Sequence, residues 1–212
     1  MTLTARLDYT FQNPELLKLA LTHRSAHKMH NERLEFLGDR VLNLCVAAML
    51  YQNKPQAEEG ELARYHAALV REETLAIVAE QWALADDLQL GRFEAAGGGA
   101  SNQSILADAV EAVLAAVYLD GGLSPAQQIV QTYWQPLVDT VRTLDAKTDL
   151  QERLQAAREA LPHYEVIGST GKDHDKMFTV KVSCAWGCAT GQGSSKQAAS
   201  QAAAQSMLEK TI

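Results

Sequence analysis

The sequence contains few cysteines and no long apolar run. Three cysteines occur among 212 residues, namely Cys45, Cys184 and Cys188. So small a number argues against a disulfide framework and predicts a protein of the reducing cytoplasm. Every apolar stretch falls short of the roughly 18 residues that a membrane-spanning helix needs, and the first residues lack the basic and then apolar pattern of a secretory leader. We therefore expect a cytoplasmic protein with no membrane association.

An excess of positive charge is also missing. The chain has 19 Lys and Arg against 26 Asp and Glu, which gives a net charge of −7. Residues 146–212 alone carry eight basic and seven acidic side chains, a net charge of +1, so the preceding part carries −8. A basic surface is the usual footprint of a protein that binds nucleic acid. Any such surface on this chain must therefore be local.

Alternating apolar and polar residues, which are typical of strands, do not occur before Asp145. Helical periods occur instead, and a glycine-rich segment at 92–102 predicts a flexible loop. The pattern predicts an all-α domain over residues 1–145, with a helix from Pro14, a helix from Glu32 that Lys54 and Pro55 break, one or two helices around 61–84, and helices over 104–120 and over about 125–144.

The pattern changes after Asp145. A polar helix is followed by three short runs that alternate apolar and polar residues, around 163–171, 176–186 and 188–194. An alanine-rich final helix follows, with Ser194 or Ser195 as its cap. Residues 146–212 are thus predicted to form an α-β-β-β-α domain, so the whole chain is expected to be a multi-domain α and α+β protein.

One predicted helix carries a row of carboxylates beside its apolar stripe. Asn31 is a good N-cap residue for a helix from Glu32, and Glu32, Glu35 and Asp39 follow at helical spacing. Like charges at this spacing repel one another, so another interaction must favour them. A divalent cation is one explanation, since Mg²⁺ prefers carboxylate oxygens. A solvated acidic face is the alternative, and this helix alone leaves both open.

A second helix carries acids in an apolar setting. The helix predicted to open at Ser104 is apolar nearly all round, yet it has Asp108 and Glu111 on one face. No Lys or Arg lies between Ile105 and Gly122 to pair with them. A buried carboxylate costs several kcal/mol unless it is paired or binds a metal. If the two helices face one another, their acids build an all-oxygen site for one or two Mg²⁺ ions.

These two segments resemble a known family. NERLEFLGDRVL, residues 31–42, closely resembles the signature of the ribonuclease III family, and residues 105–122 resemble its second acidic helix. The similarity continues through residues 21–27, 58–76 and 90–99. The C-terminal part resembles a double-stranded-RNA-binding domain in its order of elements and in its motifs around Lys147-Thr148, Leu150 to Glu152, Gly171, His174, Phe178, Gly193 to Lys196 and Ala202 to Ala204.

The resemblance implies an activity and partners. It implies a Mg²⁺-dependent homodimeric endoribonuclease, with Mn²⁺ as a substitute, that cleaves double-stranded RNA by two-metal hydrolysis. The implied products have 5′-phosphate and 3′-hydroxyl ends with short 3′ overhangs. Ribosomal RNA precursors and other structured transcripts are the implied substrates. A duplex has two strands and each site cuts one, which agrees with a symmetric homodimer.

The resemblance also implies roles for individual residues. The metal ligands would be Glu35, Asp39, Asp108 and Glu111, of which Asp39 and Glu111 would be catalytic. Auxiliary acids would be Glu32 and Glu59, although a solvated Glu59 is an open alternative. Phe36 would lie in the dimer interface, and His23 would either contact RNA or be structural. RNA contacts would come from Gln151, Glu152, His174, Ser195 and Lys196.

The chain departs from the family pattern at two basic positions. Ala100 and Ser101 follow the glycine-rich segment, and Gln197 and Ala198 follow Lys196, where basic residues are common in the family. Two other classes of function stay open from the residues alone. One is a catalytically silent RNA-binding protein, against which the four acids argue. The other is a phosphohydrolase of small nucleotides, against which the C-terminal domain argues.

Overall fold

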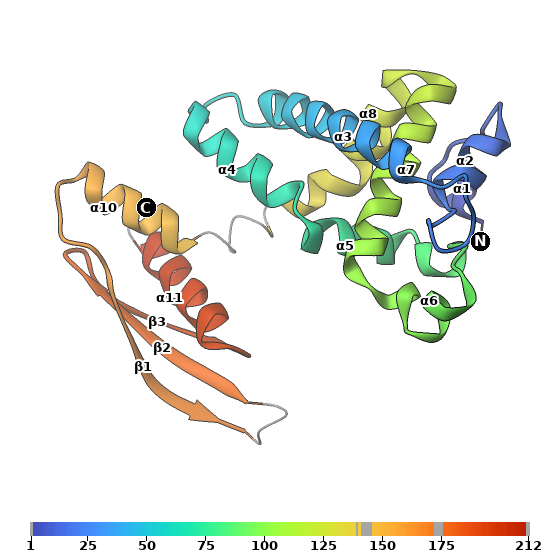
Figure 1. Ribbon diagram of the computed structural model, residues 1–212. Coiled ribbons are helices and arrows are strands. Elements are labelled where there is room, and N and C mark those ends of the chain that lie inside the picture. The colour runs from blue at the N-terminus through green and yellow to red at the C-terminus, as the bar shows by residue number, and fades with distance from the viewer. Residues whose placement is uncertain (1, 139, 141–145, 172–175, 211–212) are drawn as a thin grey trace. The chain divides into compact units, whose positions relative to one another are not determined.

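The computed structural model describes residues 2–138, 140, 146–171 and 176–210. The chain divides into two compact units, Met1–Val138 and Asp139–Ile212, hereafter unit 1 and unit 2 (Figure 1). The predicted domain boundary after Asp145 falls among residues outside this description and stays a prediction.

Unit 1 is helical in its described residues, apart from one isolated parallel bridge between Thr22 and Gln89. The predicted all-α character of the first domain is therefore confirmed. Its α-helices are α1 (Leu3–Arg6), α2 (Pro14–Ala20), α3 (Glu32–Asn53), α4 (Glu59–Leu69), α5 (Glu72–Gln81), α6 (Arg92–Ala96), α7 (Gln103–Gly121) and α8 (Leu123–Trp134). Short 3-10 helices are η1 (Leu84–Asp86), η2 (Gly99–Ser101) and η3 (Gln135–Leu137).

Helix α7 is the central element of unit 1. Its residues from Ala109 to Val117 are fully buried except at Glu111, and it contacts α2, α3, α5 and α8. A helix that is apolar nearly all round can be covered on every side, as predicted. The two half-buried carboxylates of α7 therefore lie inside the helical unit rather than on a solvated face.

Three local predictions in unit 1 are wrong. Asn102, rather than Ser104, caps α7, because its side chain accepts hydrogen bonds from the N–H groups of Ser104 and Ile105. The segment predicted as a loop at 92–102 forms α6 and η2, because alanine favours helix within this glycine-rich stretch. Helix α8 covers only the first part of the helix predicted over 125–144, because it ends at Trp134 and is followed by η3, which contains a proline; positions 139 and 141–145 of that prediction lie outside the described residues.

Unit 2 has the predicted α-β-β-β-α order. Helix α10 (Ala146–Ala156) precedes an antiparallel sheet of β1 (His163–Thr170), β2 (Met177–Cys184) and β3 (Gly187–Gly193), and α11 (Lys196–Lys210) ends the unit. Leu150, Leu154, Val182 and Met207 lie in its core. The predicted cap at Ser195 is confirmed, since its Oγ accepts a hydrogen bond from the N–H of Ala198 at 3.1 Å.

No helix in the described part of the chain has both the length and the apolar character needed to cross a bilayer.

Candidate active site

The two acidic helices meet at a glycine. A Cβ atom at Gly38 of α3 would overlap the backbone carbonyl of Glu111 on α7. Because Gly38 has no side chain, the two backbones approach directly at this point. Glu35 and Asp39 lie one turn before and one residue after this contact, so the contact holds them beside the acids of α7.

A cavity of about 520 Å³ is lined by two of the predicted metal ligands, Glu35 and Asp108, whereas Asp39 and Glu111 are not among the described residues that line it. Its polar lining combines carboxylates with hydrogen-bond donors, namely Glu32, Glu35, Glu94 and Asp108 with His23 and Arg24. No lysine is among the described residues that line it, but the Arg24 guanidinium forms an ion pair with Glu32 at 3.2 Å. The cavity thus presents both negative charge and donors, as a site for a metal-bound phosphate requires.

The acids influence one another. Burial, followed by the negative charges of Asp39, Asp108 and Glu35, raises the pKa of Glu111 to about 8. Burial and the charge of Asp108 raise the pKa of Glu35, while burial and the charge of Glu72 raise that of Asp108. Carboxylates from both helices therefore lie close enough to oppose the ionisation of their neighbours. A bound cation would reverse this effect.

Asp39 is held differently from the other three acids. It forms an ion pair with Arg40, and its Oδ1 accepts a hydrogen bond from Nδ2 of Asn43 at 2.7 Å. The backbone carbonyl of Asn43 in turn lies 3.1 Å from Nε2 of His66 on α4. These contacts orient the Asp39 carboxylate.

The donor set fits a hard divalent cation. The four acids on α3 and α7 offer only carboxylate oxygens, which Mg²⁺, Mn²⁺ and Ca²⁺ prefer as ligands. Among the described residues, no three His, Cys, Asp or Glu side chains converge on one point as ligands of a single ion. Coordination would therefore require rotation of side chains such as Asp39, which already contacts Arg40 and Asn43.

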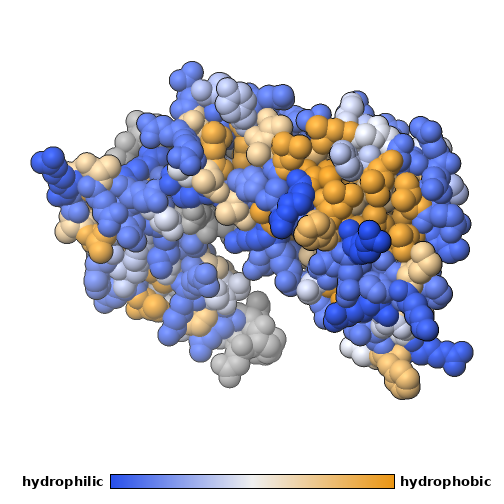
Figure 2. All heavy atoms as spheres, turned by 45° about the horizontal axis from the view of Figure 1, so that its top comes forward, coloured by the Kyte–Doolittle hydropathy of each residue, from blue (hydrophilic) through white to orange (hydrophobic). Residues whose placement is uncertain are grey.

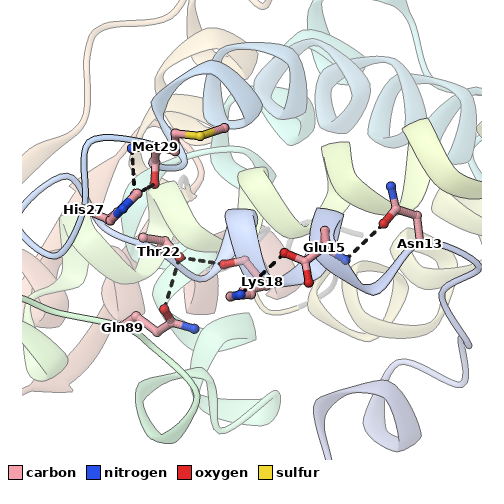
Figure 3. Close-up of polar contacts among 7 residues, drawn as sticks. All are labelled: Asn13, Glu15, Lys18, Thr22, His27, Met29 and Gln89. Atoms are coloured by element: carbon pink, nitrogen blue, oxygen red, sulfur yellow. Dashed lines mark hydrogen bonds and ion pairs between the residues drawn. The ribbon is translucent and has the colours of Figure 1, made fainter.

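The segment after α2 brings His23 and Arg24 to the cavity. Thr22 Oγ1 donates to the Lys18 carbonyl at 2.7 Å and lies 3.3 Å from Oε1 of Gln89 (Figure 3). The N–H of His23 donates to the backbone carbonyl of Gln89 at 3.0 Å. The backbone at His23 is thus anchored to a segment far away in the chain.

Some predicted residues lie elsewhere. Glu59 is exposed at the first position of α4 and does not line the cavity. Phe36 is 69% exposed, with the Arg40 guanidinium 5.7 Å from its ring centroid. Asn31 occupies the N-cap position, but its backbone is helical and its side chain makes no capping hydrogen bond, contrary to our expectation. That side chain is only 2% exposed.

The predicted RNA contacts of unit 2 lie on two helices. Gln151 and Glu152 are exposed on α10, while Ser195 and Lys196 are exposed at the start of α11. His174 lies outside the described residues, so its place in the fold stays a prediction.

Comparison with known proteins decides the family. Residues 13–137 match a model described as ribonuclease-III-like, and residues 146–211 match the double-stranded RNA binding motif. The chain belongs to the ribonuclease III family. Members of this family are metal-dependent endoribonucleases that bind double-stranded RNA, so the chain is an enzyme rather than a silent scaffold.

Individual relatives agree with the ribonuclease III assignment. Ribonuclease 3 of Haemophilus influenzae is 48% identical over 183 residues, which cover 84% of this chain and 81% of that protein. Ribonuclease 3 of Chromobacterium violaceum is 48% identical over 189 residues, covering 87% of this chain and 79% of that protein. A solved nuclease domain of ribonuclease III from Campylobacter jejuni is 39% identical, with a TM-score of 0.61, and the alignment covers 63% of this chain and 94% of that chain.

Sequence reasoning missed the residues that shape this ribonuclease III site rather than its acids. Gly38 and Asn102 were not singled out, and neither were Arg24 and Glu94 of the cavity. Gly38 had a usable signal, because glycine inside a strongly helical segment is costly and often marks a close approach. The cavity residues had no such signal, since the lining comes from four separate segments of the chain.

Proposed function

We propose that this chain is a Mg²⁺-dependent ribonuclease III that hydrolyses both strands of duplex RNA. The observation that carries the proposal is the direct contact of α3 and α7 at Gly38, which places Glu35 and Asp39 beside Asp108 and Glu111. Burial, together with this concentration of negative charge, raises the pKa of Glu111 to about 8. A site of this kind suits a cation that then binds a phosphate.

Four acids would hold the metal. Glu35, Asp39, Asp108 and Glu111 are the proposed ligands, with Glu32 and Glu59 as auxiliary acids. Divalent ions held by these acids would neutralise charge on the phosphate and activate water. Asp39 would orient the attacking water or accept its proton, and Glu111 would combine ligand and catalytic roles. Attack at phosphorus with cleavage of the bond to O3′ leaves 5′-phosphate and 3′-hydroxyl ends, with short 3′ overhangs on a duplex.

Unit 2 would bind the substrate by its shape. Domains of this type contact two minor grooves and the major-groove phosphates between them. Gln151 and Glu152 on α10 and Ser195 and Lys196 on α11 are the proposed contacts, and His174 is proposed from sequence alone. Ribosomal RNA precursors and other structured transcripts are the proposed substrates, in the cytoplasm, where the three free cysteines of the chain would stay reduced.

Dimerisation would use the outer face of α3. Phe36, Leu44 and Tyr51 are 69%, 54% and 76% exposed, and they recur along one side of this helix. Figure 2 shows apolar side chains gathered on the surface of unit 1. Exposed apolar patches of this kind favour burial in an interface. The structure from Campylobacter jejuni is described as having a region involved in dimer formation, which supports a homodimer here.

The test is cleavage of a long perfect RNA duplex in different ions. We expect cleavage in Mg²⁺ and Mn²⁺, no cleavage in a chelator, and duplex binding without cleavage in Ca²⁺, whose looser coordination positions water poorly. Gel electrophoresis measures products, and filter binding measures affinity. Cleavage that persists undiminished in the chelator would contradict the metal-dependent mechanism.

A second prediction concerns the start of α11. Gln197 and Ala198 are exposed on its first turn, beside Lys196. We expect Gln197→Lys with Ala198→Lys to tighten duplex binding and to steepen the dependence of log affinity on log salt by roughly 0.9 per new phosphate contact, because each contact releases counterions. Affinity measured at several salt concentrations checks this.

The matched control adds the same charge to another face of unit 2. Cys188 and Gln192 are exposed on β3 and alternate with residues that contact α11. Cys188→Lys with Gln192→Lys should leave the salt slope near that of the parent. Equal slopes for the α11 variant and the parent would show that this helix end does not face RNA.

A further inference from the structure

The imidazole of His23 is held in one tautomer. Its Nδ1 lies 2.8 Å from Oγ of Ser25 and accepts a hydrogen bond from the backbone N–H of Ser25 at 3.2 Å. A backbone N–H can only donate, so Nδ1 must carry its lone pair rather than a proton. The ring proton of the neutral imidazole is therefore on Nε2.

The hydroxyl of Ser25 reinforces this arrangement. Its oxygen accepts a hydrogen bond from the N–H of Gly91 at 2.9 Å, so its proton remains to be donated to Nδ1 of His23. A Cβ at position 91 would overlap the backbone carbonyl of Ser25, so glycine is required for this approach. The N–H of His23 donates to the carbonyl of Gln89, two residues before Gly91. Two contacts between the same segments thus fix the ring.

The remaining nitrogen of His23 is available at the cavity. His23 lines the same cavity as Glu35 and Asp108, and Arg24 lies beside it. In the described part of the chain, the hydrogen bonds of the His23 ring are made through Nδ1, which leaves the Nε2–H without an acceptor. Phosphate oxygens accept hydrogen bonds and cannot donate them, so this group is suited to a phosphate.

We propose that His23 contacts the RNA directly, by donating its Nε2–H to a phosphate oxygen of the strand at the acidic cavity. Ser25 is then a positioning residue that keeps the proton on Nε2. The inference rests on the proposed function, because the cavity takes a phosphate only in that reaction. The cavity is lined by the carboxylates of Glu32, Glu35, Glu94 and Asp108. Their negative charge repels a phosphate unless donors such as His23 and Arg24 offset it.

The experiment replaces His23 by glutamine or by asparagine, each of which places an amide near a different ring nitrogen. The glutamine amide extends to about the position of Nε2, whereas the asparagine amide ends near that of Nδ1. We expect His23→Asn to lower kcat/KM for duplex cleavage by about 10- to 100-fold, as the loss of a hydrogen bond to a charged group does. His23→Gln should retain most of the activity. The loss should be in KM and in duplex affinity in Ca²⁺, because the contact forms on binding.

His27 provides the matched control. Its Nδ1 also accepts a backbone N–H, from Met29 at 3.0 Å, but it does not line the cavity (Figure 3). His27→Asn should behave as the parent does. An equal loss in this variant would show that the effect belongs to the loop and would overturn the specific role of His23.

Nitrogen NMR and duplex binding of the full chain test the positioning role of Ser25. The parent and Ser25→Ala should both show His23 with its proton on Nε2, because the backbone N–H at position 25 donates to Nδ1 in each. Loss of the hydroxyl, which links Nδ1 to the N–H of Gly91, should weaken duplex binding a few-fold, with rescue by Ser25→Thr. Parent-like affinity and cleavage in His23→Asn would overturn the proposal. A parent that leaves the duplex intact in Mg²⁺ overturns the proposed function instead, and equal affinities of parent and His23→Asn in Ca²⁺ would then overturn the contact as well.

Discussion

Glu111→Gln is expected to abolish cleavage of duplex RNA while leaving unit 1 folded. The substitution removes one negative charge and a proposed metal ligand but keeps nearly the same volume. The carboxylate is surrounded by Asp39, Asp108 and Glu35, whose charges help to raise its pKa to about 8. Removal of a key catalytic group typically lowers turnover by at least about 10³-fold. Single-turnover cleavage in saturating Mg²⁺ measures this loss.

The same substitution should stabilise the protein in a chelator. The folded-state pKa of Glu111 is about 8, against an ordinary value of 4.5, so ionisation favours the unfolded state. The stability of the parent therefore falls as pH rises between these two values, and glutamine removes this dependence. At pH 8 we expect Tm to rise by about 3–6 °C. At pH 5 the difference should nearly vanish, because the carboxyl is mostly protonated when folded.

Glu80→Gln is the matched control, because it removes one negative charge from an exposed position on α5. It should leave both cleavage and the pH dependence of Tm close to those of the parent. Near-normal turnover of Glu111→Gln would refute the catalytic assignment. An unchanged Tm at pH 8, with cleavage lost, would show that burial and neighbouring charge cost the folded state little.

Gly38→Ala is expected to disrupt unit 1 and its active site together. The new methyl group would overlap the backbone carbonyl of Glu111, which cannot rotate away as a side chain can. Overpacking usually costs about 1–3 kcal/mol, and a backbone neighbour places this case at or above the upper limit. We expect Tm to fall by about 6–12 °C. Cleavage should fall at least about 100-fold, since small displacements of reacting groups have effects of that size.

Gly60→Ala controls for the change of residue type. Gly60 also lies in a helix, but its Cβ would meet only the Nη1 atom of Arg64 at 3.8 Å. Alanine is the better helix former, so Tm should stay equal or rise slightly. Melting curves and cleavage assays on Gly38→Ala and Gly60→Ala measure the two effects. A parent-like Gly38→Ala would show that α3 and α7 are free to separate.

The elements that carry the acids were predictable from the sequence. The helical period from Glu32 and the apolar surroundings of Asp108 and Glu111 predicted two helices that share a site, and both helices are present. The α-β-β-β-α order of unit 2 was also predictable, because alternation with period two is distinct from a helical period. The local pattern of residue types is enough to predict an element whose structure depends mainly on its own sequence.

The remaining features depend on contacts between distant segments. Whether Asn102 or Ser104 caps α7 depends on backbone angles that both residues can adopt, and the structure selects Asn102. The hydrogen bond between Ser25 and Gly91 joins positions 66 residues apart, so no local sequence pattern predicts it. The metal ligands remain predictions as well, since their side chains do not converge as ligands among the described residues.

The glycine contact between α3 and α7 also limits how this enzyme can change. Where side chains separate two helices, evolution can widen or narrow the gap by exchanging leucine for alanine or valine. Here the backbones of the two helices are in direct contact, so substitutions cannot change the distance between the helices in small steps. New preferences for RNA should therefore arise at peripheral positions, such as the loop at 22–31 and the first turn of α11. The distance between α3 and α7 at the reaction centre should stay the same.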